Sequence, residues 1–171
     1  MRIIGLAGWS GAGKTTLLAR ILPRLIGRGL TVSTIKHAHH AFDVDQPGKD
    51  SHTHRLAGAT EVLVSSATRW ALVHELRGAD ELLLGALVRK LAPVDLVLVE
   101  GFKRGPHPKL EIFRTEIGKP LLHPDDPRIV AVAADVPLPA ANVPVLALDD
   151  FEGIVDALLA HAAPLETVTG D

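Results

Sequence analysis

The sequence predicts a layered α/β domain with a mainly parallel sheet, and three observations favour this class. Short runs of β-branched and aliphatic residues alternate with longer segments of helical period. Residues 94–101 are almost uninterruptedly apolar, as in a parallel strand buried on both faces. The 171 residues, 47% of them hydrophobic, suffice for one ordinary domain with a core. We therefore expect a single domain over residues 1–164 and a short, loose polar tail at 165–171.

The first part of the chain alternates strands with a helix. Residues 2–7 and 30–35 predict two strands, and residues 17–26 carry apolar side chains at helical spacing between them. Pro23 should kink this helix, because proline removes a backbone donor and crowds the preceding turn. Residues 36–49 are polar and predict a long surface loop.

The middle of the chain predicts smaller elements. A short helix is expected at residues 50–57. Two short, closely spaced apolar runs at 61–65 and 69–76 predict an antiparallel pair at the edge of the sheet. The leucines and valine between residues 79 and 91 fall on one broad helical face.

The last part of the chain returns to strands and ends in a helix. This helix is expected to begin at Asp149, whose side chain would cap it while Glu152 reaches back. The strands expected before it are residues 94–101, 109–114, 128–134 and 143–148.

Composition and charge exclude several classes. The formal net charge of −2 supplies no basic field for nucleic-acid phosphates, so we expect no nucleic-acid partner. The absence of cysteine excludes disulfides and thiolate metal sites. Glycines interrupt the apolar N-terminal run, so neither a signal peptide nor a membrane span is expected, and a cytoplasmic location is the default.

The segment between the first strand and the first helix carries the most specific chemistry. Gly8, Gly13, Lys14 and Thr15 have the spacing G-x-x-x-x-G-K-T. A diphosphate needs donors along a curved path, and only a backbone almost free of side chains wraps it closely, while the helix N-terminus adds free N–H groups. The pattern predicts a P-loop NTPase-type three-layer domain. The residues expected to hold the nucleotide are Gly8, Trp9, Ser10, Gly11, Ala12, Gly13, Lys14, Thr15 and Thr16.

Individual roles follow from this geometry. Lys14 is expected to reach the β- and γ-phosphates, Thr15 to place its hydroxyl on Mg²⁺, and Thr16 to reach the α-phosphate. Glu100 ends the apolar strand, at the edge where parallel sheets bind ligands, so it is expected near the metal, with Gly101 beside the nucleotide. The alternative is that Glu100 only terminates the strand.

The polar loop at 36–49 has the place of a switch segment. An acid in this loop or directly after it is expected to orient the attacking water, while Lys14 and the amides of the glycine loop stabilise charge. Asp50 is the first candidate for this acid and Asp45 the second. Asp50 is also a candidate metal ligand. Three clustered histidines suggest a transition-metal site, but hydrogen bonding near the phosphates is favoured. These histidines are His37, His39 and His40.

A basic cluster follows Glu100. Lys103, Arg104 and Lys109 either contact an anionic ligand or partner, or form a solvated surface, and both interpretations stay open. Trp9 and Trp70 are expected to pack rather than to stack on a base.

Together these motifs resemble the MobB family, adapter proteins of molybdopterin-guanine dinucleotide biosynthesis. The resemblance covers nearly the whole chain. It is carried by residues 8–16, 35–59, 95–103 and 108–114.

The resemblance implies GTP binding with Mg²⁺, slow GTP hydrolysis, a homodimer, and cooperation with the guanylyltransferase that joins GMP to molybdopterin. Molybdopterin itself and molybdoenzymes are further implied partners. The sequence departs from usual GTPases because it has no Asn-Lys-x-Asp segment to read guanine. Asp135, which follows the strand at 128–134, is the first candidate for contact with the base.

Two other functions share the P-loop. A small-molecule kinase needs an acceptor site and usually an arginine-rich lid, for which Arg55 and Arg69 are isolated candidates. A nickel-delivering metallochaperone GTPase would use the histidine cluster.

Overall fold

The computed structural model describes residues 1–38 and 42–169. These group into two compact units, one made of Met1–His37 with Leu84–Asp171 and the other of Ala38–Leu83. The sequence predicts one domain, because its composition shows no linker at either boundary. The second unit is inserted between residues 37 and 84 of the first. Composition alone does not indicate this insertion.

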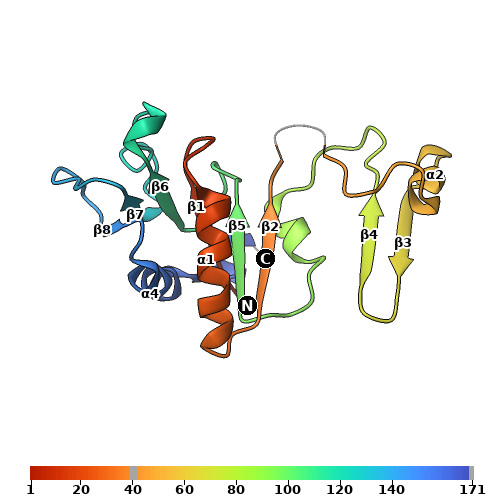
Figure 1. Cartoon of the computed structure of the whole chain (residues 1–171), viewed down its shortest axis with the longest axis horizontal. Coiled ribbons are helices and arrows are strands. Elements are labelled where there is room, and N and C mark those ends of the chain that lie inside the picture. The colour runs from red at the N-terminus through yellow and green to blue at the C-terminus, as the bar shows by residue number, and fades with distance from the viewer. Residues whose placement is uncertain (39–41, 170–171) are drawn as a thin grey trace. The chain divides into compact units, whose positions relative to one another are not determined.

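The first unit is built on one sheet with the strand order β2-β5-β1-β6-β7-β8 (Figure 1). All neighbours in this order run parallel, as the apolar strand patterns predict. The short β9 pairs with β1 in the antiparallel direction. The strands are β1 (Arg2–Ala7), β2 (Val32–Lys36), β5 (Leu96–Glu100), β6 (Lys109–Phe113), β7 (Ile129–Ala134), β8 (Val145–Ala147) and β9 (Ala163–Pro164).

Helices cover both faces of this sheet, which confirms the three-layer prediction. On one face, α1 (Lys14–Gly27) and α4 (Phe151–His161) pack their apolar stripes against alternate residues of β1 and β5. Figure 1 shows α1 crossing in front of the sheet. On the other face lie α3 (Leu84–Val88) and α5 (Glu166–Thr169). None of the described helices has the length and apolar character that a membrane crossing requires.

Helix α1 contains Pro23 in its interior, as predicted, and continues to Gly27. Two other local predictions differ from the structure. The helix expected over residues 79–91 is limited to α3, since only Leu84 and Val88 of its apolar face are buried. The segment after residue 164 is not wholly loose, because Leu165 and Val168 pack in the core cluster beneath α3.

The second unit contains α2 (Asp50–Leu56), β3 (Glu61–Ser65) and β4 (Trp70–His74). The predicted antiparallel pairing of β3 with β4 is confirmed. Its predicted place at the edge of the main sheet is wrong, because the two strands form a sheet of their own. The turn hydrogen bond from Ser66 N to Arg69 O closes the hairpin on itself. A short apolar run predicts a strand, but it does not determine whether the hairpin also pairs with a strand of another sheet.

Candidate nucleotide-binding site

The glycine-rich loop joins the end of β1 to the start of α1. Gly8, Gly11 and Gly13 all have positive φ, at 144°, 83° and 94°. A Cβ on Gly8 would lie 2.6 Å from the carbonyl oxygen of Ile112, so this position needs glycine for space as well as for conformation. The first turn of α1 begins at Lys14, directly after the loop, and its free N–H groups are the donors that a phosphate needs.

The Lys14 side chain folds back over the loop. Its Nζ donates to the carbonyl oxygens of Gly8, at 3.0 Å, and Trp9, at 2.9 Å. Partial burial lowers the pKa of Lys14, an effect that Glu100 opposes and that Lys103 and Lys36 reinforce. An anion bound in the loop would relieve this electrostatic cost, as a phosphate-binding lysine requires.

Thr15 and Glu100, two of the residues expected near the metal, meet at the mouth of the loop. Thr15 Oγ1 donates to Glu100 Oε1 at 2.8 Å. The Nζ of Lys36, which ends the neighbouring strand, lies 3.6 Å from the same carboxylate oxygen. Asp95 lies at the opposite end of β5, where it accepts hydrogen bonds from Thr31 N and Oγ1. The hydroxyl and carboxylate are hard oxygen donors, so this pair fits Mg²⁺ chemically.

Backbone geometry brings the end of β2 close to the residue after Glu100. Gly101 has φ 96°, and a Cβ there would lie 2.7 Å from the Cβ of His37. The His37 ring packs on Phe102 with 4.7 Å between ring centroids. His39 and His40 lie outside the described residues. Within the described residues no group of three histidine, aspartate or glutamate side chains is arranged to hold a metal.

The Trp9 side chain is held beside the loop, as a packing role predicts. Its Nε1 donates to Pro120 O at 2.7 Å, and the ammonium groups of Lys103 and Lys119 lie 4.7 and 6.0 Å from its ring centroid. Lys103 therefore flanks the site. Lys109 does not belong to this basic surface, because it is buried and its Nζ donates to Gly105 O and Asp126.

A cavity of about 490 Å³ adjoins the loop on the side of β7 and β8. Thr16 and Asp135, which were expected near the nucleotide, both line it. Further lining residues were not predicted, since they come from elements far apart in the sequence and follow no motif. Those with a charged or aromatic side chain are Arg20, Arg114, Asp149 and Phe151.

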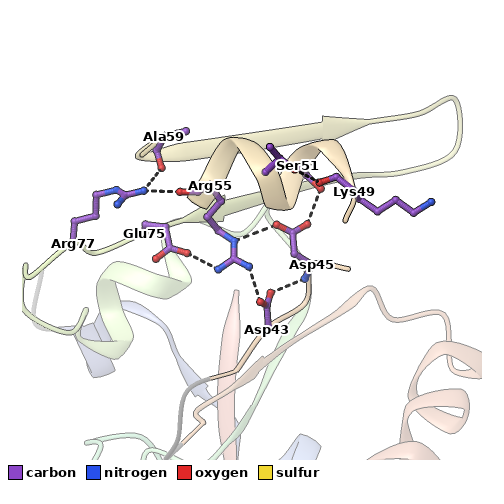
Figure 2. Close-up of polar contacts among 9 residues, drawn as sticks. Asp43, Asp45, Lys49, Ser51, Arg55, Ala59, Glu75 and Arg77 are labelled. Carbon is purple, nitrogen blue, oxygen red and sulfur yellow. Dashed lines mark hydrogen bonds and ion pairs between the residues drawn. The ribbon is translucent and has the colours of Figure 1, made fainter. Parts of the chain in front are cut away.

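The two switch-loop acids belong to the second unit and differ in their surroundings. Figure 2 shows Asp45 within a network centred on Arg55. Asp45 lies 3.2 Å from Arg55 Nε and accepts a hydrogen bond from Ser51 Oγ at 2.7 Å. Asp50 is exposed at the first position of α2. Asp45 is thus committed to local structure within the second unit.

The chain is similar to proteins of one family over most of its length. The family model MobB, described as molybdopterin guanine dinucleotide synthesis protein B, matches residues 3–135. The molybdopterin-guanine dinucleotide biosynthesis adapter protein of Escherichia coli K12 is 44% identical over 157 residues, which cover 90% of this chain and 89% of that protein. The Haemophilus influenzae adapter protein is 43% identical over 136 residues, covering 80% and 76%.

Solved structures agree with this relationship. The crystal structure of Bacillus subtilis MobB matches with a TM-score of 0.74 and 25% identity, covering 95% of this chain and 98% of that one. A crystal structure of molybdopterin-guanine biosynthesis protein B matches with a TM-score of 0.71 and 26% identity, covering 92% and 98%. The family model and these relatives lead to one conclusion: the chain belongs to the MobB family.

Proposed function

We propose that the chain binds GTP with Mg²⁺ at the P-loop and serves as an adapter in molybdopterin-guanine dinucleotide biosynthesis, with slow GTP hydrolysis. The observation that carries the proposal is the 2.8 Å contact between Thr15 and Glu100 beside Lys14. It brings a hydroxyl, a carboxylate and an ammonium group to the mouth of one glycine loop, which is the set that a triphosphate with Mg²⁺ requires. The adapter role is supported by the names of the relatives at 43–44% identity.

The phosphates are assigned to the loop amides and Lys14. The two carbonyl contacts of the Lys14 Nζ would be exchanged for oxygens of the β- and γ-phosphates, which restores charge-assisted hydrogen bonds to this partly buried ammonium. Mg²⁺ would be held by Thr15, with Glu100 as carboxylate partner. The metal supplies charge neutralisation between the β- and γ-phosphates.

Hydrolysis in this proposal depends on positioning rather than on a strong base. Asp50 is the first candidate for orienting water, since its neighbour Asp45 is engaged by Arg55 and Ser51. The nucleoside is assigned to the cavity of about 490 Å³ next to Gly13 and Thr16. A pocket of this size that opens directly from the phosphate loop accommodates a ribose and base.

The second unit offers a surface for a second copy of this chain. The register of β3 and β4 places Leu63 opposite Leu72 and Ser65 opposite Trp70 on one face of the hairpin. The side chains of Leu63 and Trp70 are 62% and 68% exposed. A two-stranded sheet with an uncovered apolar face is marginal alone, and a self-complementary pairing of two such faces would cover both. We therefore assign the homodimer contact to this hairpin.

Isothermal titration calorimetry with GTP, GDP and ATP, each with and without Mg²⁺, tests the nucleotide proposal. We expect Lys14→Ala to weaken GTP binding by about 100-fold, because it removes a charge-assisted contact. Lys90→Ala, at an exposed position of the first unit, is the matched control. Equal GTP affinity of Lys14→Ala and the wild type would refute binding at the P-loop.

The adapter proposal is tested with a molybdopterin guanylyltransferase as the partner. Its affinity is measured with a non-hydrolysable GTP analogue, with GDP and without nucleotide, and then with Lys103→Glu plus Arg104→Glu. A nucleotide switch typically couples by about 1–3 kcal/mol, or about 5- to 150-fold in affinity. Equal affinity in all three states would exclude the switch, and no binding in any state would refute the adapter role for that partner.

A further inference from the structure

The cavity beside the P-loop contains two acidic residues that differ in availability. Asp135 follows β7 and Asp149 follows β8, so both lie where the carboxyl ends of neighbouring parallel strands meet the cavity. The sequence offers Asp135 as the first candidate for contact with a base. The hydrogen bonds around the two carboxylates lead to the opposite choice.

The Asp135 carboxylate is already committed to the protein. Its Oδ1 and Oδ2 lie 3.1 and 3.2 Å from Thr115 N, and Oδ2 accepts the Thr115 hydroxyl at 3.0 Å. These bonds tie the end of β7 to the 3₁₀ turn η1 (Thr115–Ile117). Both carboxylate oxygens therefore hold the wall of the cavity in shape, and a ligand that recruited them would have to break this tie.

The Asp149 carboxylate is left available by the way α4 begins. The sequence predicts Asp149 as the helix cap, but the cap is Asp150, whose Oδ1 accepts a hydrogen bond from Gly153 N at 3.0 Å. Within residues 1–38 and 42–169, the Asp149 side chain has no hydrogen bond or ion pair to another residue. Its backbone is nevertheless fixed, because Asp150 N donates to Ala147 O and Leu148 N donates to Ala134 O.

The chemistry of guanine fits one available carboxylate. Guanine presents two adjacent donors, N1–H and the 2-amino group, which a single carboxylate accepts in a bidentate manner. Adenine presents a donor beside an acceptor, and the acceptor would face the negative charge. The other charged side chains lining the cavity, Arg20 and Arg114, offer only donors, which match the guanine O6 or the ribose oxygens.

We propose that Asp149, rather than Asp135, is the residue that selects guanine by accepting the N1–H and 2-amino hydrogen bonds. This inference rests on the proposed function, in which the P-loop holds the phosphates of GTP. It explains how base selection is achieved in a chain without an Asn-Lys-x-Asp segment: the acid comes from the turn between the last parallel strand and its helix.

Base analogues with Asp149→Asn test the proposal, Asp135→Asn tests the rival assignment, and Lys90→Ala, at an exposed position outside the cavity lining, is the control. Calorimetry with Mg²⁺ is carried out with GTP, ITP, which lacks the 2-amino group, XTP, which carries an oxygen there, and ATP. The wild type should bind GTP about 10- to 100-fold more tightly than ITP or XTP, as expected for hydrogen bonds to a charged acceptor. Asp149→Asn should lose this preference and gain affinity for XTP, because the asparagine amide donates where the carboxylate accepted. Asp135→Asn should keep the wild-type order.

Each other outcome overturns the proposal in a distinguishable way. An unchanged GTP preference in Asp149→Asn refutes the role of Asp149, and a switch to XTP in Asp135→Asn instead transfers that role to Asp135. If the wild type binds GTP, ITP and ATP alike, guanine selection fails while phosphate binding at the P-loop stands. If the wild type binds no nucleotide, both this inference and the proposed function fail. Circular dichroism of the variants distinguishes a loss of nucleotide binding from a loss of fold.

Discussion

Acidification should destabilise the protein through His107, which precedes β6. The ring is fully buried, and neither ring nitrogen has a hydrogen-bond partner among the described residues. The pKa of His107 is lowered from 6.5 to about 4, mainly by burial. The positive charges of Lys109 and Arg128 also lower this pKa, and the negative charge of Asp126 raises it. An added Cβ at Gly5 or Gly105 would lie 2.7 Å from a ring carbon, so the ring is closely enclosed on both sides.

The sign of the pH effect follows from the two pKa values. In the unfolded chain the imidazole has its ordinary pKa near 6.5, so the unfolded state takes up the proton first as pH falls. The free energy of unfolding therefore has its full value above pH 6.5 and decreases between 6.5 and about 4, below which this contribution is constant. At about 1.36 kcal/mol per pH unit, the loss amounts to about 3 kcal/mol.

Urea unfolding of the wild type and of His107→Leu at intervals from pH 7 to pH 4 isolates this contribution. Other titrating groups cancel in the difference between the two proteins, so the wild type should lose about 3 kcal/mol relative to the variant over this range. His107→Gln provides a second non-titrating side chain in case leucine packs poorly. His161→Gln, at an exposed position, should follow the wild type. Parallel stability curves for the wild type and both His107 variants would refute the reasoning.

Three further changes probe the metal pair, the hairpin and the Arg55 network. Glu100→Gln should weaken GTP binding more with Mg²⁺ than without it in calorimetry, because the charge that faces the metal is lost; equal losses would make Glu100 structural. Leu63→Asp with Leu72→Asp should convert a dimer to a monomer in light scattering, and an unchanged mass would place the dimer contact elsewhere. Arg55→Ala should speed amide hydrogen exchange in residues 42–57, since three carboxylates lose their shared partner; unchanged exchange would show that the network does not stabilise the unit.

The parts of the site that the sequence predicts are those encoded locally. The glycine spacing fixes the loop between β1 and α1, because each glycine answers a backbone requirement at its own position. The apolar run before Glu100 fixes its place at the carboxyl end of a parallel strand, and β5 pairs with both β1 and β2 as such a strand must. The contact between Thr15 and Glu100, 85 residues apart, follows from these two local facts.

The parts that the sequence does not predict depend on long-range competition. Asp149 and Asp150 both suit a helix cap, and only the turn after β8 decides that Asp150 takes this role. The sequence leaves Lys109 either on a solvated surface or in contact with an anionic ligand, and it makes no prediction for Glu111. Both are buried, at 1% and 0% exposure, because loops from other parts of the chain cover that face. No local sequence pattern indicates that loops cover this face of β6.

The two buried charges of β6 have a consequence for the site, because they hold the loops that flank the P-loop. Lys109 Nζ donates to Gly105 O at 2.8 Å, in the loop that follows Glu100 and carries Lys103. The Glu111 carboxylate accepts hydrogen bonds from the backbone N–H groups of residues 122 and 123, two and three residues beyond Pro120, and burial raises its pKa. Both loops converge on the Trp9 indole beside the phosphate loop. Buried charges are costly to stability, whereas directed hydrogen bonds fix backbone positions that apolar side chains would leave loose. Lys109 and Glu111 therefore tie both of these loops to β6.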